Sequence, residues 1–296
     1  MIVATCVSLC TACKDTAHDD RLSLREELYE LIDTVPGTVG IAYVSDTDTI
    51  TVNNGVKYPM MSVFKFHQAL AVACVLEKRG HYLDSTLFIH ADELDRDTWS
   101  PMLINYSDAD FSISVAELLK YSITLSDNNA SNLLFKHIVT PTETDEFVRH
   151  IAKDCAFQIS CSESEMKDII YLCYSNYSSP LSAALLMRQI FEESLVGGVY
   201  QDSIKRYLSE VSTGVDRLGA AVADSEMAIF AHKTGSGYRN EAGELTAHND
   251  IGYFLYRDGR NYSLAVFIRD FRGSEQEAST VIANISKCVY KYHKNR

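Results

Sequence analysis

Ser62 and Lys65 stand three residues apart, just ahead of a stretch that is apolar on nearly every face. Gln68 to Arg79 has the composition of a helix, and Gly80 supplies a stop. A helix this apolar is usually buried, so Ser62 is expected near its first turn and Lys65 on the same face. Free N–H groups and the helix dipole favour negative charge there. A buried lysine tends to lose its proton, so Lys65 could activate Ser62 as a nucleophile.

The spacing alone is a weak signal. It also fits a serine that caps the helix and a lysine that extends to water. The same Ser-x-x-Lys pattern recurs at Ser164 and Lys167, where nothing suggests a nucleophile. Further polar groups are therefore needed before Ser62 can be assigned a chemical role.

Two tripeptides supply such groups. Ser126-Asp127-Asn128 precedes a helix that starts near Asn129, which also fits an ordinary N-cap. Lys233-Thr234-Gly235, followed by Ser236-Gly237, ends a predicted strand, which also fits a polar strand end entering a glycine turn. Each tripeptide arises by chance about one time in twenty in a chain of this length. Their joint occurrence with Ser62 and Lys65, in this order and separated by a helical block, indicates one shared site.

The elements around these groups indicate a mixed α/β (α+β) fold. Periodicity predicts a helix over 23–34 and a β-hairpin over 39–52. After Ser62 the pattern is mainly helical, and the better helix candidates are 115–121, 129–139, 145–152 and 180–193. The last part of the chain is predicted as strands over 227–233, 250–256 and 262–268 and a helix over 274–292. We expect an antiparallel sheet built from both chain ends, with an all-helical domain inserted between them.

Composition narrows the class of partner. The chain has 296 residues, is 46% hydrophobic and carries a net charge of −13. This acidic balance argues against nucleic acid or an anionic membrane surface as partner. No apolar run reaches the roughly 18 residues of a membrane span.

The first residues are predicted to be a leader. Met1 to Ala12 is apolar and small, and Lys14 to Arg21 is polar, so a secretory signal over about 1–19 is expected. Leu9 to Cys13 resembles a lipoprotein cleavage box with Cys13 as the lipidated residue, and a plain cleaved leader is the alternative.

The five cysteines beyond the leader lie among apolar neighbours without Cys-x-x-Cys spacing, so we expect small buried side chains. The sequence does not decide whether a disulfide such as Cys161–Cys173 forms.

The three polar groups resemble the signature elements of class A serine β-lactamases. The resemblance runs from about Arg21 to Lys291. Within the class, 59–65, 98–101 and 126–132 resemble the CfxA-type and PER-type cephalosporinase branch, the CfxA type most of all. The resemblance implies the fold shared with penicillin-binding proteins: a five-stranded antiparallel sheet from 20–57 and 208–296, a helical domain over 58–207, and the active site between them. It implies no metal and no cofactor.

The resemblance also implies roles. Ser62 attacks the lactam carbonyl, Lys65 assists its deprotonation, and Ser126 passes a proton to the leaving nitrogen along a path polarised by Lys233. The backbone N–H groups of Ser62 and Ser236 form the oxyanion hole. The implied substrate contacts are Asn128 for the side-chain amide, Thr234, Ser236 and Arg217 for the carboxylate, and Trp99 at the cleft mouth. For Arg217, a plain surface arginine is the alternative.

The base that releases the acyl group is implied by residues 160–180, which resemble the Ω-loop of the class. Aligning Phe157 and Tyr174-x-Asn176 with the branch places Glu163 as the general base that activates water. Glu165, two residues on, is the competing register. Lys167 departs from the class, which usually has an asparagine there that helps to hold the water. This departure puts the loop geometry and the turnover rate in question.

The neck of the loop departs from the class as well. Cys161 and Asn176 stand where the class usually has an arginine and an aspartate, a change that the branch shares. We expect a secreted, periplasmic, monomeric β-lactamase that hydrolyses cephalosporins and penicillins, confers antibiotic resistance and needs no protein partner. The alternatives are a penicillin-binding DD-peptidase or transpeptidase, which lacks an Ω-loop base, and a β-lactam sensor that stays acylated.

Overall fold

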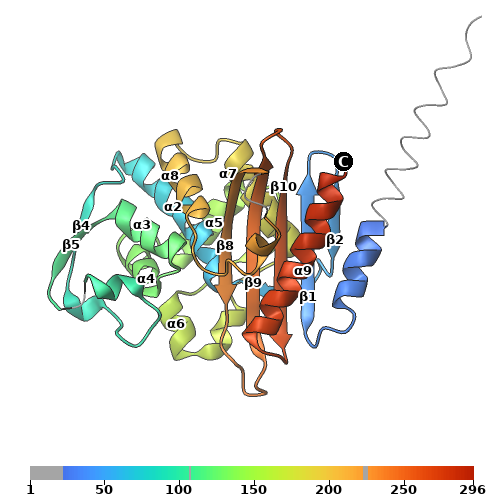
Figure 1. Ribbon diagram of the computed structural model, residues 1–296. Helices are drawn as coiled ribbons and strands as arrows, with labels where there is room; N and C mark the ends of the chain where they lie inside the picture. The colour runs from blue at the N-terminus through green and yellow to red at the C-terminus, as the bar shows by residue number, and fades with distance from the viewer. Residues whose placement is uncertain (1–22, 107, 223–225) are drawn as a thin grey trace, which may run out of the picture.

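Two distant parts of the chain build one antiparallel five-stranded sheet in the computed structural model (Figure 1), which describes residues 23–106, 108–222 and 226–296. The predicted leader over 1–19 and Cys13 lie outside the described residues. In spatial order the strands are β2 (Thr49–Val52), β1 (Thr38–Ser45), β10 (Asn261–Phe271), β9 (Leu245–Tyr256) and β8 (Met227–Ser236). The predicted sheet from both chain ends is therefore confirmed, and the division into domains at 57/58 and 207/208 stays a prediction.

Side chains alternate between the two faces of this sheet, as the pleat requires. On β1, Ile41 and Tyr43 belong to the core on the outer face, and Ala42 and Val44 belong to the core on the inner face. The same alternation runs along β10 and separates the outer set Leu264, Val266 and Ile268 from the inner set Ala265 and Phe267. The sheet thus has apolar layers on both faces.

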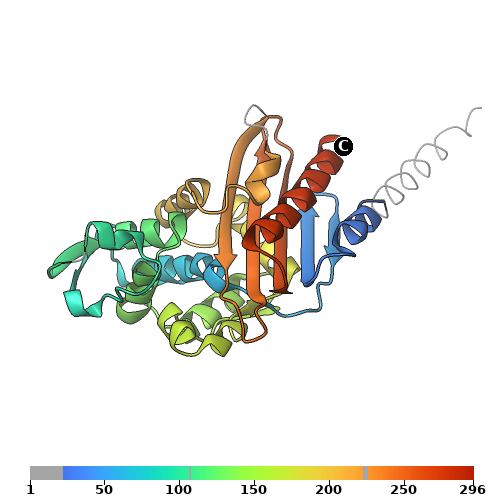
Figure 2. The ribbon, with the colours of Figure 1, turned by 60° about the horizontal axis from the view of Figure 1, so that its bottom comes forward.

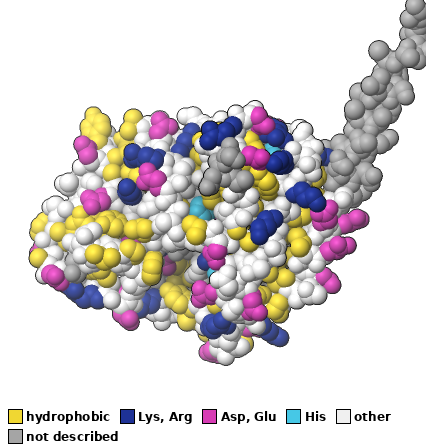
Figure 3. Space-filling model, in the orientation of Figure 1, with side chains coloured by type: hydrophobic (Ala, Val, Ile, Leu, Met, Phe, Trp, Pro, Cys, Tyr) yellow, Lys and Arg dark blue, Asp and Glu magenta, His cyan; other side chains and the backbone are white. Residues whose placement is uncertain are grey.

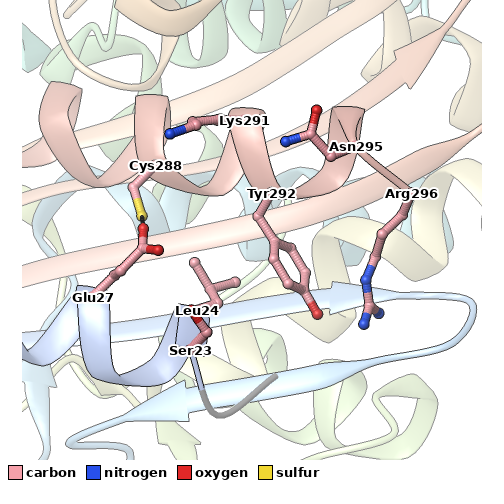
Figure 4. A pocket seen from close by; sticks show the side chains of 8 residues that line it. All are labelled: Ser23, Leu24, Glu27, Cys288, Lys291, Tyr292, Asn295 and Arg296. Atoms are coloured by element: carbon pink, nitrogen blue, oxygen red, sulfur yellow. Dashed lines mark hydrogen bonds between the residues drawn. The ribbon is translucent and has the colours of Figure 1, made fainter. Parts of the chain in front are cut away.

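Two helices cover the outer face. A helix over residues 23–32 contributes Leu24 and Leu28, and α9 (Glu275–Lys294) lies across the sheet beside it (Figure 2). A cavity of about 270 Å³ remains between the two helices, and there the Cys288 thiol donates a 3.3 Å hydrogen bond to Glu27 (Figure 4). The α9 helix is fixed at its start by a capping box in which Ser274 and Glu277 bind each other's backbone.

The helical block packs against the inner face. Its helices are α2 (Phe64–Arg79), α3 (Val115–Thr124), α4 (Asn128–His137), α5 (Pro141–Ile151), α6 (Glu163–Asp168), α7 (Pro180–Glu192) and α8 (Gly198–Ser209). The α2 helix runs through the middle of the block and is buried along most of its length, as its all-round apolar sequence predicts. It ends at Gly80, which has φ 64°, a left-handed conformation that glycine adopts without strain.

The block also holds small β-structures that the sequence does not predict. These are β3 (Tyr58–Pro59), β6 (Phe157–Gln158) and β7 (Tyr177–Ser178) in one sheet, and β4 (Thr86–Ile89) with β5 (Phe111–Ser114) in another. Strands of two to four residues are too short to show a period, so their pairing partners define them. The α8 helix is also missed, because Gly197 gives it no side-chain cap. Short 3-10 turns are η1 (Met61–Val63), η2 (Ala91–Glu93), η3 (Pro101–Ile104), η4 (Ile170–Tyr174) and η5 (Leu218–Ala221).

Acidic and basic side chains are interspersed on the face shown in Figure 3, and hydrophobic side chains gather there over β4, β5 and α3. Among the residues that the structure describes, no helix combines the length and apolar character needed to cross a membrane.

The cysteines beyond the leader are all free thiols: Cys74, Cys161 and Cys173 are buried, Cys288 is half-buried and Cys155 is exposed. The expectation of a buried side chain is therefore wrong for Cys155, which lies after the end of α5 and donates to the Arg149 carbonyl.

Candidate active site

Ser62 lies in the 3-10 turn η1, which continues directly into α2. Met61, the residue before it, has φ 45°, a left-handed conformation that is unusual for a side chain of this size. Non-glycine residues hold such angles only when their surroundings fix them, and they cluster at functional sites. Ser62 therefore enters the site from a constrained turn at the start of a buried helix.

Lys65 is the centre of a hydrogen-bond network one turn further on. Its ammonium lies 3.1 Å from Ser62 Oγ, 2.8 Å from the Ser126 carbonyl and 2.7 Å from Asn128 Oδ1. It also forms a 3.0 Å ion pair with Glu163 Oε1, and both side chains are almost fully buried. The alternative of a lysine that extends to water is therefore wrong.

Glu163 completes the contact to Ser62, whose hydroxyl donates a 3.0 Å hydrogen bond to Glu163 Oε1. Glu165 does not enter this cleft. Its carboxylate caps the start of α6 and accepts 2.8 Å bonds from the backbone and the hydroxyl of Ser162. Of the two glutamates considered from sequence, the structure places Glu163 beside Ser62 and gives Glu165 a helix-capping contact.

The Ser126-Asp127-Asn128 segment serves two purposes at once. Asp127 is the N-cap of α4 and accepts a 2.9 Å bond from the Ala130 N–H, as the ordinary reading of the tripeptide predicts. Ser126, with φ 57°, and Asn128 meanwhile line the cleft. Lys233, which is fully buried, donates a 3.0 Å bond to Ser126 Oγ. Burial, and secondly the charge of Lys65, hold the pKa of Lys233 well below its usual range.

Gly235 allows β8 to approach Ser62. A Cβ atom added to it would lie 2.3 Å from the Met60 carbonyl and 3.2 Å from Val63 Cγ2, so only glycine fits. Asn249 on β9 reinforces the contact by donating a 2.8 Å bond to the Pro59 carbonyl. The strand that carries Lys233 and Thr234 is thereby held against the turn that carries Ser62.

Arg217 extends into the part of the cleft that Thr234 and Ser236 line. Its guanidinium donates bonds of 2.6 Å to Ser236 Oγ and 2.8 Å to the Asn249 carbonyl, and the residue is only 7% exposed. The surface-arginine alternative is therefore wrong. Burial lowers the pKa of Arg217. Thr234 Oγ1 lies 2.6 Å from Thr213 Oγ1 beside this group.

Ser62 and most of the polar groups around it open on one cleft of about 410 Å³, whereas Lys65 and Lys233 are fully buried and are not part of its lining. It is lined by Met61, Ser62, Trp99, Ser126, Asn128, Glu163, Thr213, Arg217, Thr234, Ser236, Tyr238 and Glu275. Trp99 is 62% exposed and donates from Nε1 to the Leu125 carbonyl, which fixes its ring at the edge. In the described part of the chain no cluster of His, Cys, Asp and Glu side chains could hold a metal ion.

Four residues of this lining were not assigned to the site from sequence: Met61 and Thr213, which adjoin predicted groups, and Tyr238 and Glu275. Tyr238 lies two residues beyond Ser236, and period-two alternation past the strand end could have indicated it. Glu275 is in the first turn of α9, where its ordinary reading is a residue that complements the helix dipole. Only the folded chain brings that turn to the cleft.

The neck of the loop over 160–180 is closed without an ion pair. Asn176 Oδ1 accepts bonds of 2.8 Å from the Ser160 N–H and 3.1 Å from the Cys161 N–H, and its amide donates to the Cys161 carbonyl at 2.8 Å. This side chain is fully buried. Neutral hydrogen bonds thus replace the charged pair that the class usually has here.

Comparison with known proteins assigns the family. A family model described as "Beta-lactamase enzyme family" matches residues 23–293. A β-lactamase of Phocaeicola vulgatus is 45% identical over 282 residues, which cover 95% of this chain and 88% of the relative. The extended-spectrum β-lactamase PER-1 of Pseudomonas aeruginosa is 29% identical over 273 residues, which cover 91% of this chain and 87% of the relative.

Solved structures agree with the sequence relatives. A class A β-lactamase from Bacteroides cellulosilyticus superposes with a TM-score of 0.87 at 31% identity, covering 94% of this chain and 99% of that one. The TLA-1 extended-spectrum β-lactamase superposes with a TM-score of 0.87 at 30% identity, covering 92% of this chain and 99% of that one. Likeness of this extent, in sequence and in fold together, means that the chain belongs to the class A β-lactamases, a family of hydrolases.

Proposed function

We propose that this protein hydrolyses the amide bond of β-lactams through an acyl-enzyme on Ser62, with Glu163 as the base that releases the acyl group. The observation that carries the proposal is the contact of Ser62 Oγ with both partners at once, 3.1 Å from Lys65 Nζ and 3.0 Å from Glu163 Oε1. A nucleophile within reach of two proton-accepting groups fits a reaction in which a hydroxyl and then a water must be deprotonated.

Acylation uses the groups on the other side of the cleft. The Ser62 proton leaves toward the Lys65–Glu163 pair while Oγ bonds to the lactam carbonyl carbon. The C–N bond then breaks, and the nitrogen takes a proton from Ser126 Oγ, which lies 3.0 Å from Lys233 Nζ. Ser126 regains a proton from the Lys65–Glu163 pair, which thereby gives up the proton that it took from Ser62. Backbone N–H groups of Ser62 and Ser236 are assigned to the oxyanion. Asn128 is assigned to the substrate's side-chain amide.

Deacylation needs a water and a base. Glu163 takes a proton from a water that attacks the ester carbon, the ester C–O bond breaks, and Ser62 Oγ recovers its proton. Glu163 can serve this step because it is 4% exposed and held in place by Lys65. This second step separates the proposal from its alternatives, because DD-peptidases and β-lactam sensors remain acylated by β-lactams.

Cephalosporins and penicillins are the proposed substrates, and resistance to them is the proposed consequence. Support comes from the relatives, two of which are extended-spectrum β-lactamases by name. The buried Arg217 and the Ser236 hydroxyl would bind the carboxylate that both drug classes carry.

The proposed location is the periplasm, reached through the leader over 1–19, and the two alternatives there are a plain cleaved leader and a lipid anchor at Cys13. This proposal rests on sequence alone, because those residues lie outside the described part of the chain. We also propose, from sequence alone, that the protein is a monomer and acts without a protein partner. Labelling cells with radioactive palmitate, with Cys13→Ser as the control, tests the anchor.

The decisive experiment follows the acyl group by intact mass in purified protein starting near His18. Wild type should turn over a chromogenic cephalosporin, Ser62→Ala should form no adduct, and Glu163→Gln should accumulate one because only hydrolysis needs the carboxylate. Loss of a general base typically slows a step by about 10² to 10⁴.

Ser164→Ala is the matched control, since Ser164 stands in the second Ser-x-x-Lys pattern and is exposed. It should keep most of the activity. An adduct on Ser164 or Ser126, or normal turnover by Glu163→Gln, would overturn the proposed mechanism.

A further inference from the structure

Lys167 makes an ion pair that joins the α6 helix to the segment over 95–99, which ends at Trp99 in the cleft lining. Its ammonium lies 2.7 Å from Asp95 Oδ2 and 3.5 Å from Asp97 Oδ2. The hydrogen bond from Lys167 lowers the pKa of Asp95, and the same bond raises the pKa of Lys167. Both groups are therefore charged across the neutral range.

Asp95 belongs to a segment that is fastened to α4. Asn129 accepts a 2.8 Å bond from the Asp95 N–H and donates a 2.8 Å bond to the Asp95 carbonyl. Asn128 binds the same segment twice, through its N–H to the Trp99 carbonyl at 3.0 Å and through its amide to Thr98 Oγ1 at 2.9 Å. Residues 95–99 are thus a rigid continuation of the wall that holds the substrate.

The α6 helix is less firmly held. It has six residues, from Glu163 to Asp168, and its capping box binds only its own first turn. Glu163 at its start contacts Lys65 and Ser62. Beyond that, one hydrogen bond of 3.2 Å, from the Ser164 N–H to Asn132 Oδ1, joins the helix to α4. At the neck, Asn176 offers neutral contacts in place of an ion pair.

We propose that the Lys167–Asp95 ion pair is a positioning device for Glu163, which takes over the anchoring that the neck lacks. Glu163 and Lys167 are four residues apart on one short helix, so they share a face and turn together. Fixing Lys167 against residues 95–99 fixes the rotation of α6 and with it the distance from Glu163 to Ser62. This inference rests on Glu163 being the deacylating base.

The proposal separates two rate constants. Ser62, Lys65, Ser126 and Lys233 all lie outside α6, and Glu163 only assists Lys65 in acylation, so acylation should depend little on the ion pair. Deacylation should depend on it strongly, because Glu163 alone activates the water and a displacement of about 1 Å can cost a hundredfold in rate. The pair is about one third exposed on each side, so its direct contribution to folding stability is small.

The test is a double-mutant cycle read by stopped-flow kinetics with a chromogenic cephalosporin, and by intact mass. Lys167→Met keeps the aliphatic stem and removes the charge. Asp95→Asn keeps an oxygen for its 2.8 Å bond from the Asp97 N–H. Each variant should deacylate about tenfold more slowly and acylate within twofold of wild type. The double variant should be no slower than either single variant, and Lys167→Arg should restore most of the rate.

Lys153→Met is the matched control, because it removes a lysine that pairs with Glu193 on the surface of the helical block. It should leave both rates unchanged. The inference is overturned if Lys167→Met deacylates like wild type, if acylation falls by the same factor, or if the two single effects simply add. Glu163→Gln distinguishes failure of the proposed function from failure of the ion pair's proposed role. If that variant accumulates an adduct while Lys167→Met behaves like wild type, the proposed function stands and only the ion pair's role is lost.

A salt titration tests the same inference on the wild-type protein, so the result does not depend on whether a variant folds. Sodium chloride screens a partly exposed ion pair. Deacylation by wild type should slow as salt rises, and acylation should change less. A deacylation rate that does not respond to salt contradicts the inference.

Discussion

At the scale of single residues, Ser236 connects Arg217 to the position where a substrate carboxylate would bind. Its hydroxyl oxygen already accepts a 2.6 Å bond from the guanidinium, so its proton is available to a carboxylate. A hydrogen bond to a charged group contributes about 1.5–3 kcal/mol, roughly tenfold to a hundredfold in kcat/KM. Ser236→Ala should lower kcat/KM more for a cephalosporin than for benzylpenicillin, because the cephalosporin carboxylate hangs on a six-membered ring and needs the extra donor.

Steady-state assays with both substrates check this prediction, and the backbone donor of residue 236 is unchanged in the variant. Equal losses on the two substrates would rule out Ser236 as a source of preference. A wild-type enzyme that is clearly better on penicillins would do the same, and would leave the hydrolase assignment intact.

Residue types and spacing could predict the polar groups of the cleft because chemistry requires them in three short motifs. The motifs alone were enough to predict Ser62, Lys65 and Lys233 as site residues, and the structure brings these residues together. The contact between Lys167 and Asp95 could not be predicted in this way. The two residues are 72 positions apart, and only tertiary folding brings an α6 lysine to that segment.

At the scale of elements, the approach of β8 to η1 depends on Gly235. The added methyl group of Gly235→Ala would lie 2.3 Å from a backbone carbonyl, so the strand or the turn must shift. Overpacking of this kind typically costs about 1–3 kcal/mol of stability. We expect a lower melting temperature, and an activity loss of more than tenfold because Lys233 moves relative to Ser62.

Gly55→Ala is the control, since no atom lies within 4 Å of a Cβ placed there. Thermal melts and kcat/KM should show almost no effect of that change. If Gly235→Ala melted and turned over like wild type, the contact between β8 and η1 would not be tight.

Elements with a long period were predictable from sequence, and elements defined by a partner were not. The strands β9 and β10 are buried over almost their whole length and contain long apolar runs, and α9 carries a clear apolar face. In contrast, β3 and β7 have two residues each and are defined only by pairing within their small sheet, in which β7 pairs with β3 and with β6. The α6 helix of six residues likewise depends on its capping box and on the packing of Met166.

At the scale of the whole molecule, three buried histidines make the free energy of unfolding depend on pH. Burial lowers the pKa of His67 to about 4, of His248 to about 3 and of His293 to about 4. In the unfolded chain these groups titrate near 6.5. Between pH 6.5 and 5 the unfolded state therefore binds protons that the folded state does not bind. The free energy of unfolding should fall as pH falls, by up to about 1.4 kcal/mol per pH unit for each histidine.

Urea unfolding at a series of pH values from 5 to 8 measures this slope. His67→Leu should reduce it by about a third, because one of the three groups is removed. His81→Gln, a change at an exposed histidine, should leave it unchanged. A free energy of unfolding that is flat between pH 5 and 6.5 would contradict the prediction.

The pairing of β1 with β10 also determines when the protein can fold during its synthesis. Tyr43 on β1 binds His293 in α9 across 250 residues, and Thr38 pairs with Arg269. A ribosome delivers β1 early and its central neighbour nearly last, so a nascent chain holds Ser62 long before it has the sheet that completes the cleft. Contacts at such sequence separation also slow folding. A chain that stops before the β9–β10 hairpin would contain Ser62 but would lack the strands that complete the sheet beside the cleft.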